Sequence, residues 1–135
     1  MNYIDSNIFV FSVINKEHIG NLSRKLLEKV QNGETTAATS SLTFDELFWR
    51  IKKEKGFEVA VNVTRGFLEL SNLFLIEVNE NTLWKAHELI IKYNLDPRDS
   101  IHAACAILRG IHIFISEDDD FDKIREIERK SLNKL

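Results

Sequence analysis

The stretch PRDSIHAACAILRGIHIFIS, residues 97–116, decides the fold class of this chain. Its first part carries apolar residues at the spacing of one helix face: Ile101, Ala104, Cys105 and Leu108. Gly110 then marks a helix end, and the run IHIFIS, residues 111–116, is typical of a buried strand. A helix that leads directly into a strand is the repeating unit of α/β proteins.

The same alternation runs through the rest of the chain. Other strand-like runs lie at 2–4, 35–39 and 73–78. Helical periods begin near Asn7 and fill 19–32, 43–55, 57–70, 80–93, 97–109 and 119–130. Parallel strands need crossover helices between them, so this order predicts an α/β fold with a mostly parallel sheet. No linker-like tract or internal repeat interrupts it, and we expect a single domain over residues 1–135.

Composition narrows the range of possible functions. The 135 residues are 44% hydrophobic and carry a net charge of -3, which disfavours a general polyanion binder but allows a local basic rim. Cys105 is the one cysteine, so no intramolecular disulfide can form, and its apolar surroundings predict a buried thiol. No apolar run approaches the roughly 20 residues of a membrane span, and the N-terminus does not resemble a signal peptide. We therefore expect a cytoplasmic protein with no membrane contact.

Acidic residues recur directly after the expected strands or in the first turns of the helices that follow. They are Asp5, Glu46, Asp99 and the acids within residues 117–122, which number five in six positions. The carboxyl ends of parallel strands meet at one edge of the sheet, where helices begin. The pattern therefore predicts an acidic site at that edge.

Helix capping is the structural alternative for each acid, because helix N-termini favour carboxylates. Asp5 could cap the helix that begins near Asn7, and Asp96-Pro97 resembles an N-cap followed by proline at the first helical position. Thr43 and Glu46 have capping-box spacing. Capping alone does not account for all of these acids, because Asp96 would already cap the helix and Asp99 would not be needed as a cap.

Carboxylates that converge without histidine or cysteine form an all-oxygen site, which suits Mg²⁺ or Mn²⁺. Zinc is disfavoured because the histidines show no ligand spacing and Cys105 stands alone. We interpret all four histidines, His18, His87, His102 and His112, as structural or solvent-facing. Such a hard cation can activate water and neutralise charge on a phosphoryl group.

Three ordered motifs carry a family resemblance that covers nearly the whole chain: IDSNIF (4–9), SSLTFDELFW (40–49) and LDPRDSIHAACAILRGIHIFISEDDDFD (95–122). In this order they resemble the PIN domain, and within it the VapC-type toxin ribonucleases of toxin–antitoxin pairs. The resemblance implies an α/β/α sandwich around a central, mostly parallel sheet of four to five strands. It also implies an endoribonuclease that depends on Mg²⁺ or Mn²⁺ and leaves 5′-phosphate and 3′-hydroxyl ends.

The resemblance also assigns site residues. Four acids match those of the family and would be catalytic and bind one or two metal ions: Asp5, Glu46, Asp99 and Asp118. Four further residues would support them: Asn7, Ser116, Asp120 and Arg98. Ser116 would hydrogen-bond a ligand carboxylate or water, Asn7 would orient Asp5, and Arg98 would pair with a carboxylate or hold RNA phosphate.

Some features depart from the family or leave choices open. The C-terminal ERKSLNKL reads as a helix end or tail, which makes a fifth strand doubtful. Asp45 is a rival to Glu46, but adjacent helical side chains diverge by about 100°, and we choose Glu46. Within 117–122 we expect Asp119 to cap a helix, Phe121 to anchor the turn in the core, and the outer acids Glu117 and Asp122 to be surface charges.

The resemblance implies two protein partners besides an RNA substrate: a second copy of the chain and a cognate antitoxin. Apolar residues beyond the needs of one buried face are candidates for these interfaces, and they occur at Phe48, Trp49, Phe57, Val61, Phe67 and Leu68. A basic patch at Arg50 and the following lysines could hold RNA or could be a solvated helix face. Two other functions stay open: a non-enzymatic PIN module that binds RNA or protein, and a Mg²⁺-binding receiver domain.

Overall fold

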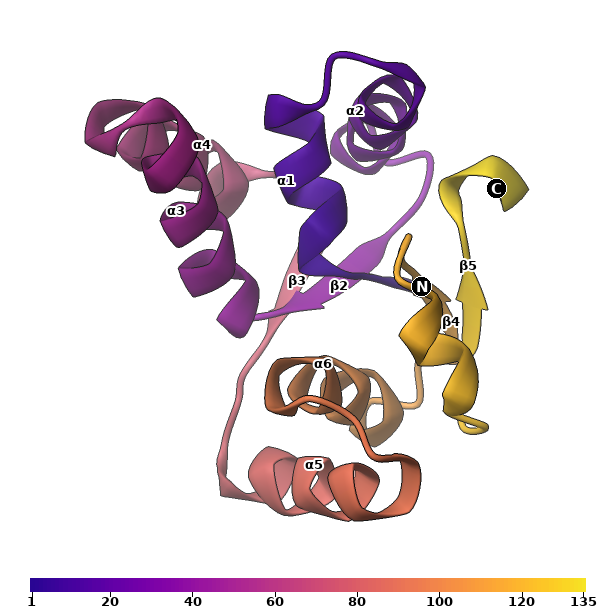
Figure 1. Cartoon of the computed structure of the whole chain (residues 1–135). Helices are drawn as coiled ribbons and strands as arrows, with labels where there is room; N and C mark the ends of the chain where they lie inside the picture. The colour runs from indigo at the N-terminus through magenta and orange to yellow at the C-terminus, as the bar shows by residue number, and fades with distance from the viewer.

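A five-stranded parallel sheet with the order β3-β2-β1-β4-β5 forms the centre of the molecule (Figure 1). The structure is a computed structural model that describes residues 1–135. The strands are β1 (Asn2–Ile4), β2 (Ala37–Ser40), β3 (Leu73–Ile76), β4 (Ile113–Ile115) and β5 (Glu128–Lys130). The α-helices are α1 (Ser6–Ile14), α2 (His18–Gln31), α3 (Leu42–Lys55), α4 (Phe57–Glu69), α5 (Glu80–Tyr93) and α6 (Pro97–Leu108). Two short 3₁₀ helices, η1 (Asp119–Lys123) and η2 (Leu132–Lys134), flank β5.

Helices cover both faces of the sheet. Helices α1 to α4 lie on one side and α5 with α6 on the other (Figure 1). Strand side chains alternate between these layers, so Tyr3 packs in the core under α5 and α6, whereas Ile4 packs in the core under α1 to α4. Tyr3 stacks on Phe114 of β4 at 4.8 Å between ring centroids, and Phe121 packs on Phe114 from η1. The expected α/β/α sandwich is confirmed.

Local sequence sets most element boundaries. Pro97 occupies the first turn of α6, where its missing N–H costs nothing. Asn79 and Thr82 form a reciprocal capping box at the start of α5. Gly56, at φ 94°, separates α3 from α4 with a backbone conformation that favours glycine. Most expected helices and strands accordingly end within a few residues of their predicted bounds.

The C-terminal segment differs from the sequence prediction. The expected helix over 119–130 is wrong: its first part is the 3₁₀ helix η1, and its last part is β5, so the fifth strand does form. The sequence misleads here because three apolar residues recur at a spacing of three, as on one helix face: Phe121, Ile124 and Ile127. All three are buried, but they lie in a 3₁₀ turn and in the chain between it and β5. The prediction that Phe121 anchors this turn is confirmed.

The sheet has a point where its strand order reverses direction, between β1 and β4. From β1 the chain first builds outward to β2 and β3, and then crosses to β4 and β5 on the other side. In open α/β sheets, ligands bind outside the carboxyl ends of the strands at such a point. None of the helices is both long and apolar enough to cross a membrane.

Candidate active site

Asp5 and Ser116 face each other across the reversal point. Asp5 directly follows β1, and Ser116 directly follows β4. The Ser116 hydroxyl donates a hydrogen bond of 2.6 Å to Asp5 Oδ2, and the Ser6 amide donates one of 2.8 Å to Asp5 Oδ1. Asp5 is thus both the N-cap of α1 and a carboxylate at the ligand-binding edge.

Burial and the groups around Asp5 shift the pKa of its carboxyl in different directions. The residue is 4% exposed, and desolvation raises the pKa of its carboxyl. The nearby His102 and the hydrogen bond from Ser116 lower the pKa, while the charge of Glu46 raises it, and the net result is a pKa above the usual range. Asp5 therefore lies in a setting where a cation would stabilise its charged form.

Three other carboxylates converge beside this pair. One oxygen each from Asp99, Asp118 and Asp120 lies within 4.8 Å of the others. Asp99 comes from the first turn of α6, and the other two from the loop and 3₁₀ turn after β4. Burial, then the charges of Asp118 and Asp5, raise the pKa of Asp99 to about 6. Glu46 does not belong to this group. Asp5 is a neighbour of the group, because its charge acts on Asp99 and because Ser116 bonds both Asp5 and the Asp118 amide.

Glu46 is held by a buried histidine. His102 Nε2 lies 2.5 Å from Glu46 Oε1 and 4.0 Å from Asp5 Oδ1, and its Nδ1 lies 2.6 Å from the Tyr3 hydroxyl. An ionised carboxylate can only accept, so Nε2 carries the proton in this bond. Burial lowers the pKa of His102, but the Glu46 hydrogen bond and the charges of Asp5 and Glu46 raise it by more. His102 thus ties Glu46 to the core from α6.

The donor set fits a hard divalent cation. The converging atoms are carboxylate oxygens with one serine hydroxyl beside them, the ligand chemistry of Mg²⁺ and Mn²⁺. Both nitrogens of His102 already have partners, so the one histidine near the acids is not free to bind zinc. Burial, and after it the charges of Asp118 and Asp5, raise the pKa of Asp99, and a bound cation would stabilise the charged form of this carboxyl.

The structure changes two capping interpretations and confirms the position of a third. Asp118, and not Asp119, caps η1, because its side chain accepts the Asp120 amide at 2.9 Å. Asp96 occupies the N-cap of α6, but its side chain makes no capping hydrogen bond. The capping box expected at Thr43 and Glu46 does not form.

Other contacts explain why that capping box is absent. Helix α3 begins at Leu42, and the Thr43 hydroxyl lies 2.7 Å from that of Thr39. The carboxylate of Glu46 is bonded to His102 instead. Glu46 is therefore not needed as a cap and is available at the site.

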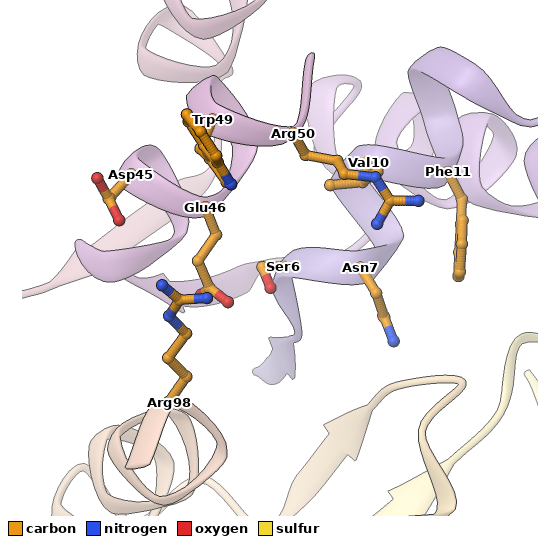
Figure 2. Close-up of a pocket in the computed structure, with 9 residues that line it drawn as sticks. All are labelled: Ser6, Asn7, Val10, Phe11, Asp45, Glu46, Trp49, Arg50 and Arg98. Carbon is orange, nitrogen blue, oxygen red and sulfur yellow. The ribbon is translucent and has the colours of Figure 1, made fainter. Parts of the chain in front are cut away.

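The supporting residues occupy different positions. Asn7 Nδ2 lies 3.3 Å from Ser116 Oγ, so Asn7 reaches Asp5 only through that hydroxyl, and Asn7 Oδ1 is buried without a partner. Arg98 is exposed and rises from the start of α6 towards Glu46, as Figure 2 shows. Asp45 is exposed and points away from Glu46, so Glu46 is the one of the two that faces His102.

The outer acids of 117–122 are partly bonded. Glu117 is partly buried and accepts the Leu132 amide at 2.6 Å, so it is not the surface charge that we expected. Asp122 is an exposed surface charge, as expected, and pairs with Arg129 at 2.8 Å. Both lie outside the converging group.

His102 is the residue that sequence reasoning missed at this site. It was interpreted as structural or solvent-facing, and it is buried, but it also bonds a candidate ligand. One signal was present: His102 follows Asp99 by three residues, which places both side chains on one face of α6.

Known proteins with the same fold support the resemblance. A chain of VapBC2 from Rickettsia felis, bound to a DNA fragment from its promoter, aligns with a TM-score of 0.76 at 20% identity, over 97% of this chain and 98% of that one. DNA-bound VapBC from Salmonella typhimurium aligns with a TM-score of 0.76 at 19% identity, over 98% of each chain. VapC20 of Mycobacterium tuberculosis, a sarcin-ricin loop cleaving toxin, aligns with a TM-score of 0.75 at 13% identity, over 90% of this chain and 93% of that one.

Sequence comparison identifies the family directly. No match was found among curated proteins. The family model of the PIN domain matches residues 3–127, which cover all six α-helices, the sheet from β1 to β4 except Asn2, and every candidate acid. This chain therefore belongs to the PIN domain family.

Proposed function

We propose that this chain is an endoribonuclease that depends on Mg²⁺ or Mn²⁺ and acts as the toxin of a toxin–antitoxin pair. PIN domains are in general nucleases that use divalent metal ions, and the chain belongs to that family. The observation that carries the proposal is the convergence of Asp99, Asp118 and Asp120 beside the Asp5–Ser116 pair at the reversal point of the sheet.

Each acid has a stated part in this proposal. Asp5 and Asp99 are the principal metal ligands, Asp118 with Asp120 completes a second position, and Glu46 binds directly or through water. When bound, the metal supplies charge neutralisation on the phosphate and an activated water. Ser116 keeps the Asp5 carboxylate in one orientation, and His102 does the same for Glu46. These contacts hold the acids in place before any cation arrives, which reduces the reorganisation that binding requires.

Incubation of the purified protein with single-stranded RNA tests the activity. We expect cleavage with Mn²⁺ or Mg²⁺ and none with EDTA. In Asp5→Asn and Asp99→Asn the rate should fall by at least about 100-fold, the scale of losing one electrostatic contact to the transition state. Asp119→Asn is the matched control, since Asp119 neighbours the cluster but is exposed and outside it, and it should keep the rate. Equal activity in all four proteins would refute the assignment.

As a toxin, this chain would have two protein partners: a cognate antitoxin and a second copy of itself. Four of the similar structures are VapBC or toxin–antitoxin complexes, which supports a cognate antitoxin for this chain as well. Large apolar side chains on α4 are exposed, with Phe57 at 61% and Leu68 at 55%, and we assign them to a homodimer interface. Phe67, in contrast, is core.

Light scattering coupled to size exclusion tests the dimer. We expect a mass near twice the 15.7 kDa of one chain at high micromolar concentration, and a shift towards monomer in Phe57→Ser. Val59→Ser, a partly exposed apolar residue on the same helix, shows whether the loss is specific to Phe57. A monomer in the unsubstituted protein would refute the dimer.

A further inference from the structure

A pocket of about 360 Å³ lies between α1 and α3, directly beside the acid site. Figure 2 shows its walls, which include Asn7 and Phe11 from α1, Asp45, Glu46, Trp49 and Arg50 from α3, and Arg98 from α6. Glu46 belongs both to this pocket and to the acid site. A ligand in the pocket would therefore lie next to the candidate metal position.

Helical spacing aims three of these side chains at the same space. Trp49 and Arg50 follow Glu46 by three and four residues, so the indole, the guanidinium and the carboxylate share one face of α3. Arg98 precedes Asp99 in the first turn of α6, and Figure 2 shows its guanidinium close to Glu46 on the opposite wall. The pocket thus combines the indole of Trp49 and the ring of Phe11 with two arginines.

These groups have spare binding capacity. Trp49 is 60% exposed, although an indole is among the side chains that gain most from burial. Arg98 makes no hydrogen bond or ion pair in the structure. Arg50 bonds Glu54 through Nε at 2.9 Å, which leaves both terminal nitrogens free of protein acceptors. An aromatic face and unsatisfied guanidinium groups are the combination that binds bases and phosphates of single-stranded nucleic acid.

We propose that this pocket binds one nucleotide of single-stranded RNA next to the scissile phosphate. The base stacks on Trp49, while Arg98 and Arg50 contact the flanking phosphates. Duplex RNA is excluded because its bases are already stacked and cannot reach the indole. This inference rests on the proposed ribonuclease function. An apolar protein side chain is a poorer occupant, because it would leave the arginines on two of the walls unpaired.

Binding of a five-nucleotide single-stranded RNA in EDTA tests the pocket without cleavage. The chain has two tryptophans, so Trp84→Phe leaves Trp49 as the one fluorescent indole and Trp49→Phe leaves Trp84. We expect RNA to quench the fluorescence of Trp84→Phe and not that of Trp49→Phe. Labelled RNA should bind Trp49→Ala about 5- to 100-fold more weakly, the range measured for a lost base stack.

Matched controls separate stacking from general surface effects. Trp84 is 67% exposed on α5 and Arg125 is exposed without an ion pair, so Trp84→Ala and Arg125→Ala should bind within twofold of wild type. Arg98→Ala should weaken binding and flatten its salt dependence. No RNA binding by wild type, or equal binding by Trp49→Ala and Trp84→Ala, would overturn the proposal. Loss of the dimer in Trp49→Ala with unchanged RNA affinity would also overturn it and assign the indole to a protein interface.

Cleavage assays distinguish this inference from the proposed function. If wild type binds RNA as described but cuts none with Mn²⁺, the nuclease fails and the pocket stands as a nucleotide site. If wild type cuts RNA and Trp49→Ala does so with the same KM and kcat, the pocket fails and the nuclease stands. Both survive only if Trp49→Ala raises KM while metal-dependent cleavage remains.

Discussion

Ser116 is the residue that links the two halves of the acid site. Its buried hydroxyl donates to Asp5 Oδ2 and accepts the Asp118 amide at 3.0 Å. Asn7 Nδ2 also donates a hydrogen bond to this hydroxyl, at 3.3 Å. A single hydroxyl thereby fixes a carboxylate after β1 and the chain after β4. Small polar residues at this position can set ligand geometry without adding a charge.

Asp99 gives the first prediction at this scale. Its pKa is raised from 3.8 to about 6, so between these values the folded chain binds more protons than the unfolded chain. Stability therefore falls as pH rises through that window, and the full penalty remains at pH 7. With EDTA present, Asp99→Asn should raise the free energy of unfolding at pH 7 by ~1–2 kcal/mol, less than the ~3 kcal/mol of an unscreened shift because the carboxyl is partly exposed.

Urea denaturation at two pH values checks this. The gain in Asp99→Asn should vanish near pH 4, where the wild-type carboxyl is protonated in the folded chain, and Asp119→Asn should show no gain at either pH. Unchanged or lower stability of Asp99→Asn at pH 7 would instead identify Asp99 as a structural cap of α6.

The contact between Tyr3 and His102 gives a second prediction at the scale of single residues. Tyr3→Phe removes the hydroxyl that partners His102 Nδ1 and leaves that nitrogen buried without a bond. We expect a loss of about 1–3 kcal/mol in the free energy of unfolding, the cost of one buried unsatisfied group. If Tyr3→Phe is as stable as the unsubstituted protein, the Tyr3 hydroxyl does not hold His102.

At the scale of elements, β5 illustrates what pattern reasoning could not find. Its residues, Glu128 to Lys130, are all charged, so no apolar alternation indicates a strand. The strand forms because its backbone pairs with β4 and because Ile127, just before it, is buried. Helices such as α5 were predictable to the residue, since their apolar face and caps are encoded locally. Edge pairing is a tertiary effect that one segment does not reveal.

Arg129 bonds the edge strand β5 to the neighbouring loop. Arg129 donates from Nε and Nη2 to both oxygens of Asp122, at 2.8 and 3.1 Å, and from Nη1 to the Ser116 carbonyl at 3.0 Å. Such bidentate pairs are among the stronger ion pairs because two charge-assisted bonds form at once. The loop that carries Asp118 and Asp120 lies between these anchor points.

Removal of this arginine should loosen the edge. In Arg129→Met we expect the Ser116 and Glu128 amides, which bond across β4 and β5, to exchange about 10-fold faster, the effect of a local loss of ~1.4 kcal/mol. Hydrogen exchange followed by NMR measures this, with Arg125→Met as the control, since Arg125 is exposed and unpaired. Equal protection in both variants would show that β5 does not depend on the Arg129 contacts.

At the scale of the whole molecule, the strand order explains why distant acids meet. Asp5, Glu46 and Asp99 are separated by 41 and 53 positions in the sequence, yet each follows the carboxyl end of the sheet or begins a helix there. Parallel topology alone made that edge predictable, and family resemblance selected the acids. The spacing of His102 from Asp99 places it near the acids, but its bonds to Tyr3 and Glu46 come from tertiary packing that the sequence does not reveal.

The central claim is that this edge binds a divalent cation through its acids. Titration of the metal-free protein with Mn²⁺, followed by calorimetry, tests it most directly. We predict binding by wild type, unchanged binding by Asp119→Asn, and affinities for Asp99→Asn and Asp118→Asn reduced by more than the about 10-fold typical of losing a ligand's hydrogen-bond partner. No Mn²⁺ binding by wild type, or equal affinity in all four proteins, would contradict it.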